Sequence, residues 1–347
     1  MVRIGIVGCN YGRAVHVPAF RHDSRCVVQA LAATNAARAA QAASACGIPL
    51  SFGNWRDLVE HDQVDAVVIA TPPRIQPEIA RHALSLGKPV LVEKPMAADE
   101  PSALAMLECA EKTGRPAMVD FTFPDILVWR EAKRLLDEGA IGALRHVFVT
   151  WNVENYATRH RTLGWKSISA EGGGALFNFV SHAFYYLEWF CGSVEGLGAH
   201  LSTLPGDSRP GESTVVLSLA FASGASGGLC MSSGSYLGSG HRIEFYGEEG
   251  ALALLNDGPD YMRGFRLLHG RRPATVLAPV YVDDKLEHAF DDGRVAPASR
   301  LAARFLDAIE RGNDARPDFS AGYRVQCLLD AARRAHQTGH WTETRRP

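Results

Sequence analysis

Three side chains of this sequence could transfer a proton or bind a reacting hydroxyl group. The first is Lys94, which follows the apolar run 89–92 in a chain with only six lysines against thirty arginines. If that run is a buried strand, the ammonium group of Lys94 lies at a dry strand end, where desolvation lowers its pKa towards neutrality. A lysine in that state can accept and donate protons during a reaction.

The other two, Asn178 and His182, are four residues apart in the apolar stretch 175–190. This spacing puts both side chains on one face of a helix, so both can contact one ligand. Histidine titrates near neutral pH, whereas an asparagine amide binds a hydroxyl without exchanging a proton. The alternative is a hydrogen-bonded core histidine on a helix that is apolar on all sides, and the spacing alone leaves both interpretations open.

Short apolar runs alternate with helical patterns in the N-terminal third of the chain. Near-continuous apolar runs are typical of strands buried on both faces of a parallel sheet. The helical patterns have clear ends, because Asn35 and Asp99 are candidate N-caps and Gly47 and Gly114 follow the last helical residues. We therefore expect a doubly wound α/β domain over residues 1–121. The predicted strands are 3–7, 27–32, 64–69, 89–92 and 116–121, and the predicted helices are 36–46, 75–86 and 100–113.

Beyond residue 121 the pattern changes to runs of alternating polarity separated by Gly, Pro and Asp, which predicts an antiparallel sheet. Helices are expected at 124–138 and 175–190, and two amphipathic helices at 301–311 and 322–337. Residues 122–347 are therefore expected to form one α+β domain with a large open antiparallel sheet. The predicted strands are 145–153, 213–222, 225–233, 242–246 and 251–255.

A glycine-containing turn follows the first predicted strand and opens a helix. It reads Gly8-Cys9-Asn10-Tyr11-Gly12-Arg13. It stands where dinucleotide-binding domains carry G-x-G-x-x-G, whose backbone amides face a pyrophosphate. Asn10 replaces the second glycine and still suits the left-handed turn, although its side chain would crowd the pyrophosphate. We predict that these six residues bind pyrophosphate in a Rossmann domain.

The second predicted strand ends without an acidic residue. In NAD-binding domains a carboxylate at this place accepts hydrogen bonds from the ribose hydroxyls. Here Thr34, Asn35 and Arg38 follow, and they could instead surround a 2′-phosphate, although Asn35 also suits a helix cap. The expected cofactor is NADP or NAD, with NADP slightly favoured.

Several motifs together resemble the Gfo/Idh/MocA family of oxidoreductases, the group of glucose–fructose oxidoreductase and inositol dehydrogenase. The Glu-Lys-Pro element followed by a triple glycine is the most specific of them, and the resemblance runs nearly end to end. The matching motifs are His16-Val17-Pro18-Ala19-Phe20, Thr71-Pro72-Pro73, Glu93-Lys94-Pro95-Met96, Gly172-Gly173-Gly174 and Gly322-Tyr323-Arg324-Val325-Gln326.

The resemblance implies an oxidoreductase that moves a hydride between a nicotinamide and a secondary alcohol or ketone of a sugar, cyclitol or related polyol. It places Lys94 near the nicotinamide and the reacting carbon. It also places Asn178 and His182 at the family's D-x-x-x-H pair, from which Asn178 departs because an amide cannot exchange a proton. Lys94 and His182 are therefore the expected proton-transfer residues, and Asn178 a ligand of a substrate hydroxyl.

Further residues are expected beside the cofactor and the substrate. Tyr156, Arg159, His160 and Arg161 form a polar and aromatic loop, of which Tyr156 and Arg161 are the substrate candidates, although such a run is also common on a solvated face. The resemblance adds a set of cofactor residues that includes the counterpart of the family's Trp-Arg loop. These residues are Thr71, Pro72, Gln76, Glu93, Trp165 and Lys166.

Two other functions are compatible with the same motifs. Some relatives hold NAD tightly and use it transiently to cleave glycosides, and others bind the dinucleotide as a signal without catalysis. Asn178 gives weight to both alternatives. The pair Lys94 and His182 favours an enzyme, because a sensor needs no proton transfer.

Composition excludes several other classes of protein. The formal net charge is −2, which provides no electrostatic footprint for nucleic acid. The longest apolar stretch, 175–191, contains Asn178, His182 and Glu188, so no membrane span or signal peptide is expected and the protein is predicted to be cytoplasmic. The seven cysteines are dispersed and odd in number, which predicts reduced thiols, and no metal-ligand spacing occurs, so we expect no metal.

The strand 213–222 also predicts an oligomer. One of its faces carries Val215, Leu217, Leu219 and Phe221, a normal core set, whereas the other is small and uncharged. Uncharged exposed sheet faces usually meet another surface, and the family resemblance points the same way. We expect a homo-oligomer, dimeric or tetrameric, in which the C-terminal domain both assembles the subunits and binds substrate.

Overall fold

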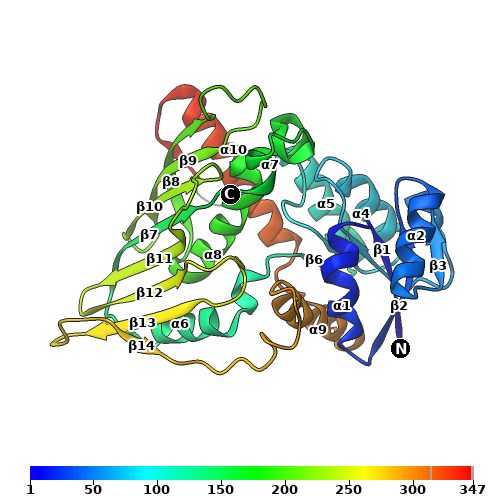
Figure 1. Cartoon of the computed structure of the whole chain (residues 1–347), viewed down its shortest axis with the longest axis horizontal. Helices are drawn as coiled ribbons and strands as arrows, with labels where there is room; N and C mark the ends of the chain where they lie inside the picture. Colours follow the sequence, from blue (N-terminus) through cyan, green and yellow to red (C-terminus); the bar gives the residue numbers. More distant parts are fainter. Residues whose placement is uncertain (313–314, 345–347) are drawn as a thin grey trace. The chain divides into compact units, whose positions relative to one another are not determined.

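The computed structural model describes residues 1–312 and 315–344. By its internal contacts the chain forms two compact units, whose elements are labelled in Figure 1. Unit 1 comprises Met1–Thr122 and Ala289–Gln326, and unit 2 comprises Phe123–His288 and the residues from Cys327 onward.

Unit 1 is built on a six-stranded sheet in the order β3-β2-β1-β4-β5-β6, with every neighbouring pair parallel. The chain winds outward from β1 in both directions, so the carboxyl ends of β1 and β4 flank a topological switch point, where ligands bind in such sheets. This confirms the predicted doubly wound domain. The strands are β1 Val2–Val7, β2 Cys26–Ala32, β3 Leu50–Phe52, β4 Ala66–Ile69, β5 Val90–Val92 and β6 Ala117–Val119.

Helices cover both faces of this sheet. Ile4 and Ile6 of β1 point into a core that includes Val17 and Phe20, while Gly5 points the opposite way and packs against Leu58. The helices that follow the strands are the π-helical turn η1 Gly12–His16, α1 Val17–Arg21, α2 Ala36–Cys46, α3 Trp55–Glu60, α4 Gln76–Ser85 and α5 Glu100–Thr113.

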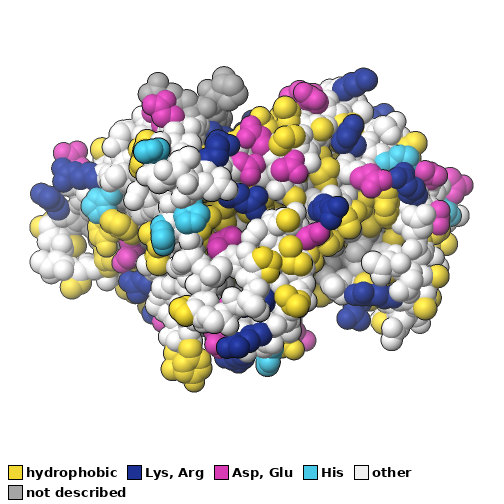
Figure 2. Space-filling view, turned by 90° about the horizontal axis from the view of Figure 1, so that it is seen from above, with side chains coloured by type: hydrophobic (Ala, Val, Ile, Leu, Met, Phe, Trp, Pro, Cys, Tyr) yellow, Lys and Arg dark blue, Asp and Glu magenta, His cyan; other side chains and the backbone are white. Residues whose placement is uncertain are grey.

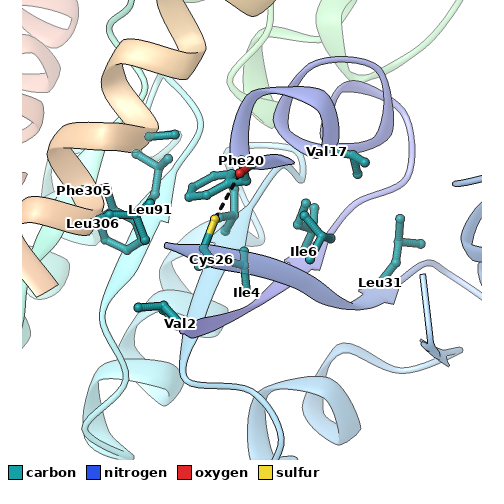
Figure 3. Packing of buried hydrophobic residues seen from close by; sticks show 14 of the residues in the cluster. Val2, Ile4, Ile6, Val17, Phe20, Cys26, Leu31, Leu91, Phe305 and Leu306 are labelled. Carbon is teal, nitrogen blue, oxygen red and sulfur yellow. Dashed lines mark hydrogen bonds between the residues drawn. The ribbon is translucent and has the colours of Figure 1, made fainter. Parts of the chain in front are cut away.

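A helix from far along the chain completes the core of unit 1. Helix α9, Val295–Arg311, places Phe305 and Leu306 beside Leu91 and Phe20, and Cys26 Sγ donates a hydrogen bond to Phe20 O at 3.0 Å (Figure 3). The predicted boundaries, 1–121 and 122–347, differ from this partition because the apolar face of α9 is buried against the first sheet.

Unit 2 contains a nine-stranded sheet in the order β14-β13-β12-β11-β7-β10-β9-β8-β15. The pairs are antiparallel except for β7 with β10, so the predicted open antiparallel sheet is present with one parallel pair. The strands are β7 Leu144–Asn152, β8 Val194–Ser202, β9 Thr214–Phe221, β10 Ser226–Ser232, β11 Gly240–Gly247, β12 Gly250–Asn256, β13 Arg266–Arg271, β14 Ala278–Val280 and β15 Thr342–Glu343.

Two of the helices expected in unit 2 are each observed as two shorter elements. The helix expected at 124–138 is a 3₁₀ turn followed by α6, because Ile126 between them has an extended backbone. The helix expected at 175–190 begins with a π-helical turn before α8, and the two amphipathic helices begin earlier than predicted. The elements are η2 Phe123–Asp125, α6 Leu127–Asp137, α7 Tyr156–Arg159, η3 Trp165–Ser167, η4 Ser169–Glu171, η5 Leu176–Val180, α8 Ser181–Cys191 and α10 Phe319–Thr338, whose first residues belong to unit 1.

Strand β9 shows the predicted alternation of buried and exposed side chains. Leu217 and Leu219 are buried, whereas Val216 is 42% exposed. Ser218 pairs with Gly228 of β10, and Gly228 pairs with Phe148 of β7, whose side chain is also exposed. Around these residues the outward face of the three strands in unit 2 is therefore small or apolar.

No helix within the described ranges is both long and apolar enough to cross a membrane. On the face shown in Figure 2, Lys and Arg side chains are interspersed with Asp and Glu and form no broad basic patch. No disulfide links any of the seven cysteines, all of which lie in the part of the chain that the structure describes.

Candidate functional site

The turn after β1 can only be made by glycine at its first position. Gly8 has φ of 113°, and a Cβ atom there would lie 2.2 Å from Ala70 O at the end of β4. At Gly12 a Cβ would lie 2.7 Å from Ile6 Cγ2. The loop therefore lies close against the ends of β1 and β4, at the switch point, with its backbone as the surface that a ligand would meet.

Asn10, the residue in place of a glycine, makes a contact that the sequence did not indicate. Its Oδ1 accepts a hydrogen bond of 2.9 Å from Arg38 Nη2, so it is tied to the start of α2. Asn35 caps α2 by accepting a hydrogen bond from the Arg38 backbone N–H, and Thr34 beside it is exposed. The end of β2 thus carries a guanidinium group where NAD-binding domains carry a carboxylate.

Gln76 supports the Glu93-Lys94-Pro95 turn after β5 through two hydrogen bonds to its backbone. Gln76 Nε2 donates hydrogen bonds to Glu93 O at 2.9 Å and to Pro95 O at 2.8 Å, on either side of Lys94. Gln76 is fully buried, so it is a support of the turn that carries Lys94. Its Oε1 and the hydroxyl of Thr71 after β4 are buried without a hydrogen-bond partner, which leaves two polar atoms at this sheet edge for a ligand.

Three titratable side chains, those of His16, Glu93 and Asp120, lie close together at this turn. His16 Nε2 lies 3.1 Å from Glu93 Oε1 and 3.7 Å from Asp120 Oδ2. Burial lowers the pKa of His16, although the charge of Asp120 opposes this. Burial, followed by the charge of Glu93, raises the pKa of Asp120 well above its ordinary value. Sequence reasoning missed Asp120, although its place directly after the β6 run, like that of Glu93 after β5, was a usable signal.

In unit 2 the triple glycine makes room for an acidic residue that was also missed. Gly174 has φ of 89°, and a Cβ there would lie 2.2 Å from Glu212 Oε1. That oxygen accepts a hydrogen bond of 2.8 Å from Leu176 N at the start of η5. Burial raises the pKa of Glu212, and the bond from Leu176 opposes the rise. Glu212 lies in the loop before β9, where no pattern marks it.

Asn178 fixes the start of the same helix. Its Nδ2 donates hydrogen bonds to Gly174 O at 2.8 Å and to Lys166 O at 2.9 Å. The amide therefore ties η5 to the Trp165–Lys166 loop. A carboxylate at this position could not make these two bonds, because it has no proton to donate.

His182 lies on α8 at the edge of a buried aromatic cluster and is 9% exposed. Its ring meets the Phe123 ring edge-on, with centroids 5.0 Å apart. A second histidine, His241, lies deeper in that cluster, stacked on Trp151, and burial lowers its pKa to about 3. His241 bonds to Tyr186 Oη at 3.0 Å, so it is the structural core histidine of unit 2.

The remaining candidates lie on loops of unit 2. Tyr156 is 73% exposed and packs on His160, and Arg161 is exposed in a left-handed conformation with φ of 47°. Lys166 Nζ lies 5.7 Å from the centre of the Trp165 ring.

Two groups of candidates therefore come together, each within its own unit. The glycine loop, Thr71, Gln76, Glu93 and Lys94 gather at the carboxyl edge of the sheet of unit 1. Asn178, Trp165 and Lys166 are joined in unit 2, which also carries His182, Tyr156 and Arg161.

A six-stranded doubly wound sheet with a glycine turn at its switch point defines a dinucleotide-binding protein. Residues 2–121 match the oxidoreductase family with an NAD-binding Rossmann fold, and residues 129–253 match the GFO/IDH/MocA C-terminal domain. An oxidoreductase of Synechocystis sp. is 31% identical over 354 residues, which cover 97% of this chain and 95% of that protein. The chain belongs to the GFO/IDH/MocA family, which confirms the resemblance found in the sequence.

Two further matches concern one kind of enzyme. Levoglucosan dehydrogenase of Pseudarthrobacter phenanthrenivorans is 26% identical over 361 residues, covering 91% of this chain and 89% of that protein. A solved structure of a levoglucosan dehydrogenase in complex with NADH and levoglucosan superposes with a TM-score of 0.90 at 23% identity, covering 99% of this chain and 100% of that one. At that identity the likeness shows that the fold is shared.

Proposed function

We propose that this oxidoreductase is an NAD(P)-dependent dehydrogenase or reductase that acts on a secondary alcohol or ketone of a sugar, cyclitol or related polyol. The observation that carries the proposal is the Lys94 turn, which Gln76 anchors on both sides at the carboxyl end of β5. The glycine turn after β1 opens at the same edge of the sheet. The relative named levoglucosan dehydrogenase supports a carbohydrate-like substrate.

The residues present fit a dinucleotide. The backbone of residues 8–13 would hold the pyrophosphate, because at Gly8 a side chain would collide with Ala70 O. The nicotinamide, when bound, supplies the hydride acceptor or donor. The side chains that would hold the remaining parts of the cofactor are Thr34, Asn35, Arg38, Thr71, Gln76, Glu93, Trp165 and Lys166, with the Pro72 backbone beside them.

Proton transfer falls to Lys94 and His182 in this proposal. Oxidation of an alcohol releases a proton from oxygen, so a base must stand within hydrogen-bond reach of the hydroxyl. Asn178 would orient a substrate hydroxyl without titrating, and its Nδ2 donates hydrogen bonds to two backbone carbonyls. Tyr156 and Arg161 are proposed to contact the substrate.

A substrate screen tests this function. Sugars, cyclitols and polyols are offered with NADP⁺ and NAD⁺, and the corresponding ketones with NADPH and NADH, while cofactor absorbance and product are both measured. Stoichiometric formation of reduced cofactor and ketone supports the proposal. Product without net cofactor change would instead indicate NAD-dependent glycoside cleavage, and tight cofactor binding without turnover on any substrate would indicate a sensor.

We predict that NADPH binds at least as tightly as NADH. The guanidinium of Arg38 is exposed at the end of β2, where a 2′-phosphate would accept charge-assisted hydrogen bonds. Arg38→Ala should weaken NADPH binding roughly tenfold or more and change NADH binding little, as measured by calorimetry. Arg56→Ala, an exposed arginine of the same unit that bonds to Glu78, is the matched control. A strong NADH preference of the wild type would show that Thr34 and Arg38 do not recognise a phosphate.

We predict a homo-oligomer assembled through the outward face of β7, β9 and β10. Val216 and Phe148 are exposed on that face among small residues, a pattern that is unfavourable in contact with water. Light scattering at micromolar concentration should give a dimer or tetramer, and Val216→Lys should lower the mass. Val276→Lys, at an exposed valine before β14, should leave the mass unchanged. A monomeric wild type would contradict this prediction.

A further inference from the structure

The three titratable side chains beneath Lys94 form an enclosed group with more acidic than basic members. His16 and Asp120 are each 1% exposed, and the side chain of Glu93 is 12% exposed. One nitrogen of His16 and one oxygen of each acid lie within 4.8 Å of one another. These three residues, called the His16 triad below, come from η1 and from the ends of β5 and β6.

The two acids of the triad cannot both be ionised at low cost. Two carboxylates in contact in a dry site repel each other, and the usual solution is that they share one proton. A proton on Asp120 would be shared with the Glu93 carboxylate, because one oxygen of each acid lies within 4.8 Å of the other. The other oxygen of Asp120, Oδ1, is buried without a hydrogen-bond partner, which a neutral acid tolerates far better than a carboxylate.

Burial acts on the remaining member of the triad in the opposite sense and lowers the pKa of His16. His16 is fully buried, and desolvation disfavours its cationic form. Its Nε2 lies at hydrogen-bond distance from Glu93 Oε1, so a neutral ring can donate there. The aromatic rings of Tyr11 and Phe20 face the imidazole and bring no further charge.

We propose that Asp120 is a carboxylic acid that shares one proton with Glu93 beside a neutral His16, and that the single negative charge left on this pair holds the ammonium group of Lys94 in place. Lys94 directly follows Glu93 in the turn that Gln76 supports, and its positive charge lowers the pKa of Asp120. Asp120 is thus a positioning residue, because it acts on the reaction through Glu93 and Lys94. This inference rests on the proposed function only in its statement about Lys94.

Infrared spectroscopy tests the shared proton without any activity measurement. The wild-type protein near neutral pH should show the C=O stretch of a protonated carboxyl group, and ¹³C-labelling of aspartate should shift that band. The band should disappear in Asp120→Asn and persist in Asp125→Asn, which removes an equally buried aspartate that bonds to Arg130 instead. A wild type without the band, or a band that does not respond to labelled aspartate, would overturn the proposal.

The pH dependence of unfolding supplies a second test. The folded-state pKa of Asp120 is raised, so its contribution to stability is complete below the unfolded pKa of about 4 and is lost as the pH rises towards the folded value. Asn lacks this titration. The wild-type unfolding constant divided by that of Asp120→Asn should therefore rise by up to about tenfold per pH unit above about pH 4. A ratio that does not change with pH would mean that Asp120 is ionised in the folded protein.

Two further measurements distinguish the proposal from a purely structural role of Glu93 and from a metal ion bound by the triad. Glu93→Gln removes the negative charge of the pair, so the limb of the activity profile that reports Lys94 should move about one unit to lower pH. If Glu93 had only a structural role, Glu93→Gln would lower the maximal activity and leave the pH of that limb unchanged.

Stability that falls on addition of EDTA would instead reveal a metal ion on the same three side chains. If turnover proves independent of Lys94, the proposed function fails, whereas the infrared and unfolding results still decide on the shared proton.

Discussion

Replacing Lys94 by methionine is expected to lower turnover about 100- to 10,000-fold while the cofactor still binds. Methionine keeps the length of the side chain and removes its only titratable group. The backbone of the turn should survive, because Gln76 bonds to the carbonyls of Glu93 and Pro95 and not to the lysine side chain. The measurements are kcat on the substrate identified by the screen and calorimetry with NADPH and NADH.

Two companion variants sharpen this result. Lys88→Met removes a half-buried lysine just before β5, at the opposite end of the strand from Lys94, and should leave turnover within a few-fold of wild type. Lys94→Arg keeps the positive charge but cannot give up its proton. If Lys94 only attracts an anionic group, the arginine variant stays active. If Lys94 transfers the proton, the arginine variant is as impaired as methionine, and near-wild-type turnover of Lys94→Met would refute the mechanism altogether.

The fold was predictable where each element carries its own periodic signal. The strands of unit 1 are buried on both faces and read as apolar runs, and β9 alternates as a half-buried strand must. Strand β3 was missed because its three residues are interrupted by a serine and are only partly buried, and β8 was missed because glycines interrupt it. The packing of α9 against the first sheet could not be predicted. An amphipathic pattern shows that a helix buries one face, but it does not show which surface covers that face.

The candidate site, like the fold, has features that could be predicted from the sequence and features that could not. Residue type and strand-end position were enough to single out Lys94, and helical spacing was enough to select His182. The supporting contacts could not be predicted from sequence, because they join distant segments; Gln76 was named only as a cofactor residue, and Glu212 was missed. Gln76 holds a turn 17 residues further on, and Glu212 holds a helix start 36 residues before it. Asn10 shows the same limit, since its bond to Arg38 joins segments 28 residues apart.

Replacing His182 by glutamine is the second change expected to have a large effect, again about 100- to 10,000-fold on turnover. Glutamine keeps a hydrogen-bonding group of similar reach on α8 but cannot accept a proton at neutral pH. The buried aromatic neighbours Phe123 and Trp151 should hold the altered side chain in place, so the melting temperature should fall by only a few degrees.

His241 provides the matched control that separates catalysis from packing. It belongs to the same aromatic cluster, but it is fully buried and already bonds to Tyr186. His241→Gln should therefore lower the melting temperature at least as much as His182→Gln, because it disturbs the stack on Trp151, while kcat per folded molecule stays within a few-fold of wild type. The decisive comparison is the pH profile of kcat/KM, from which only His182→Gln should remove a limb. If both variants lose stability and neither changes the profile, His182 is a core histidine, and proton transfer in this enzyme falls to Lys94 alone.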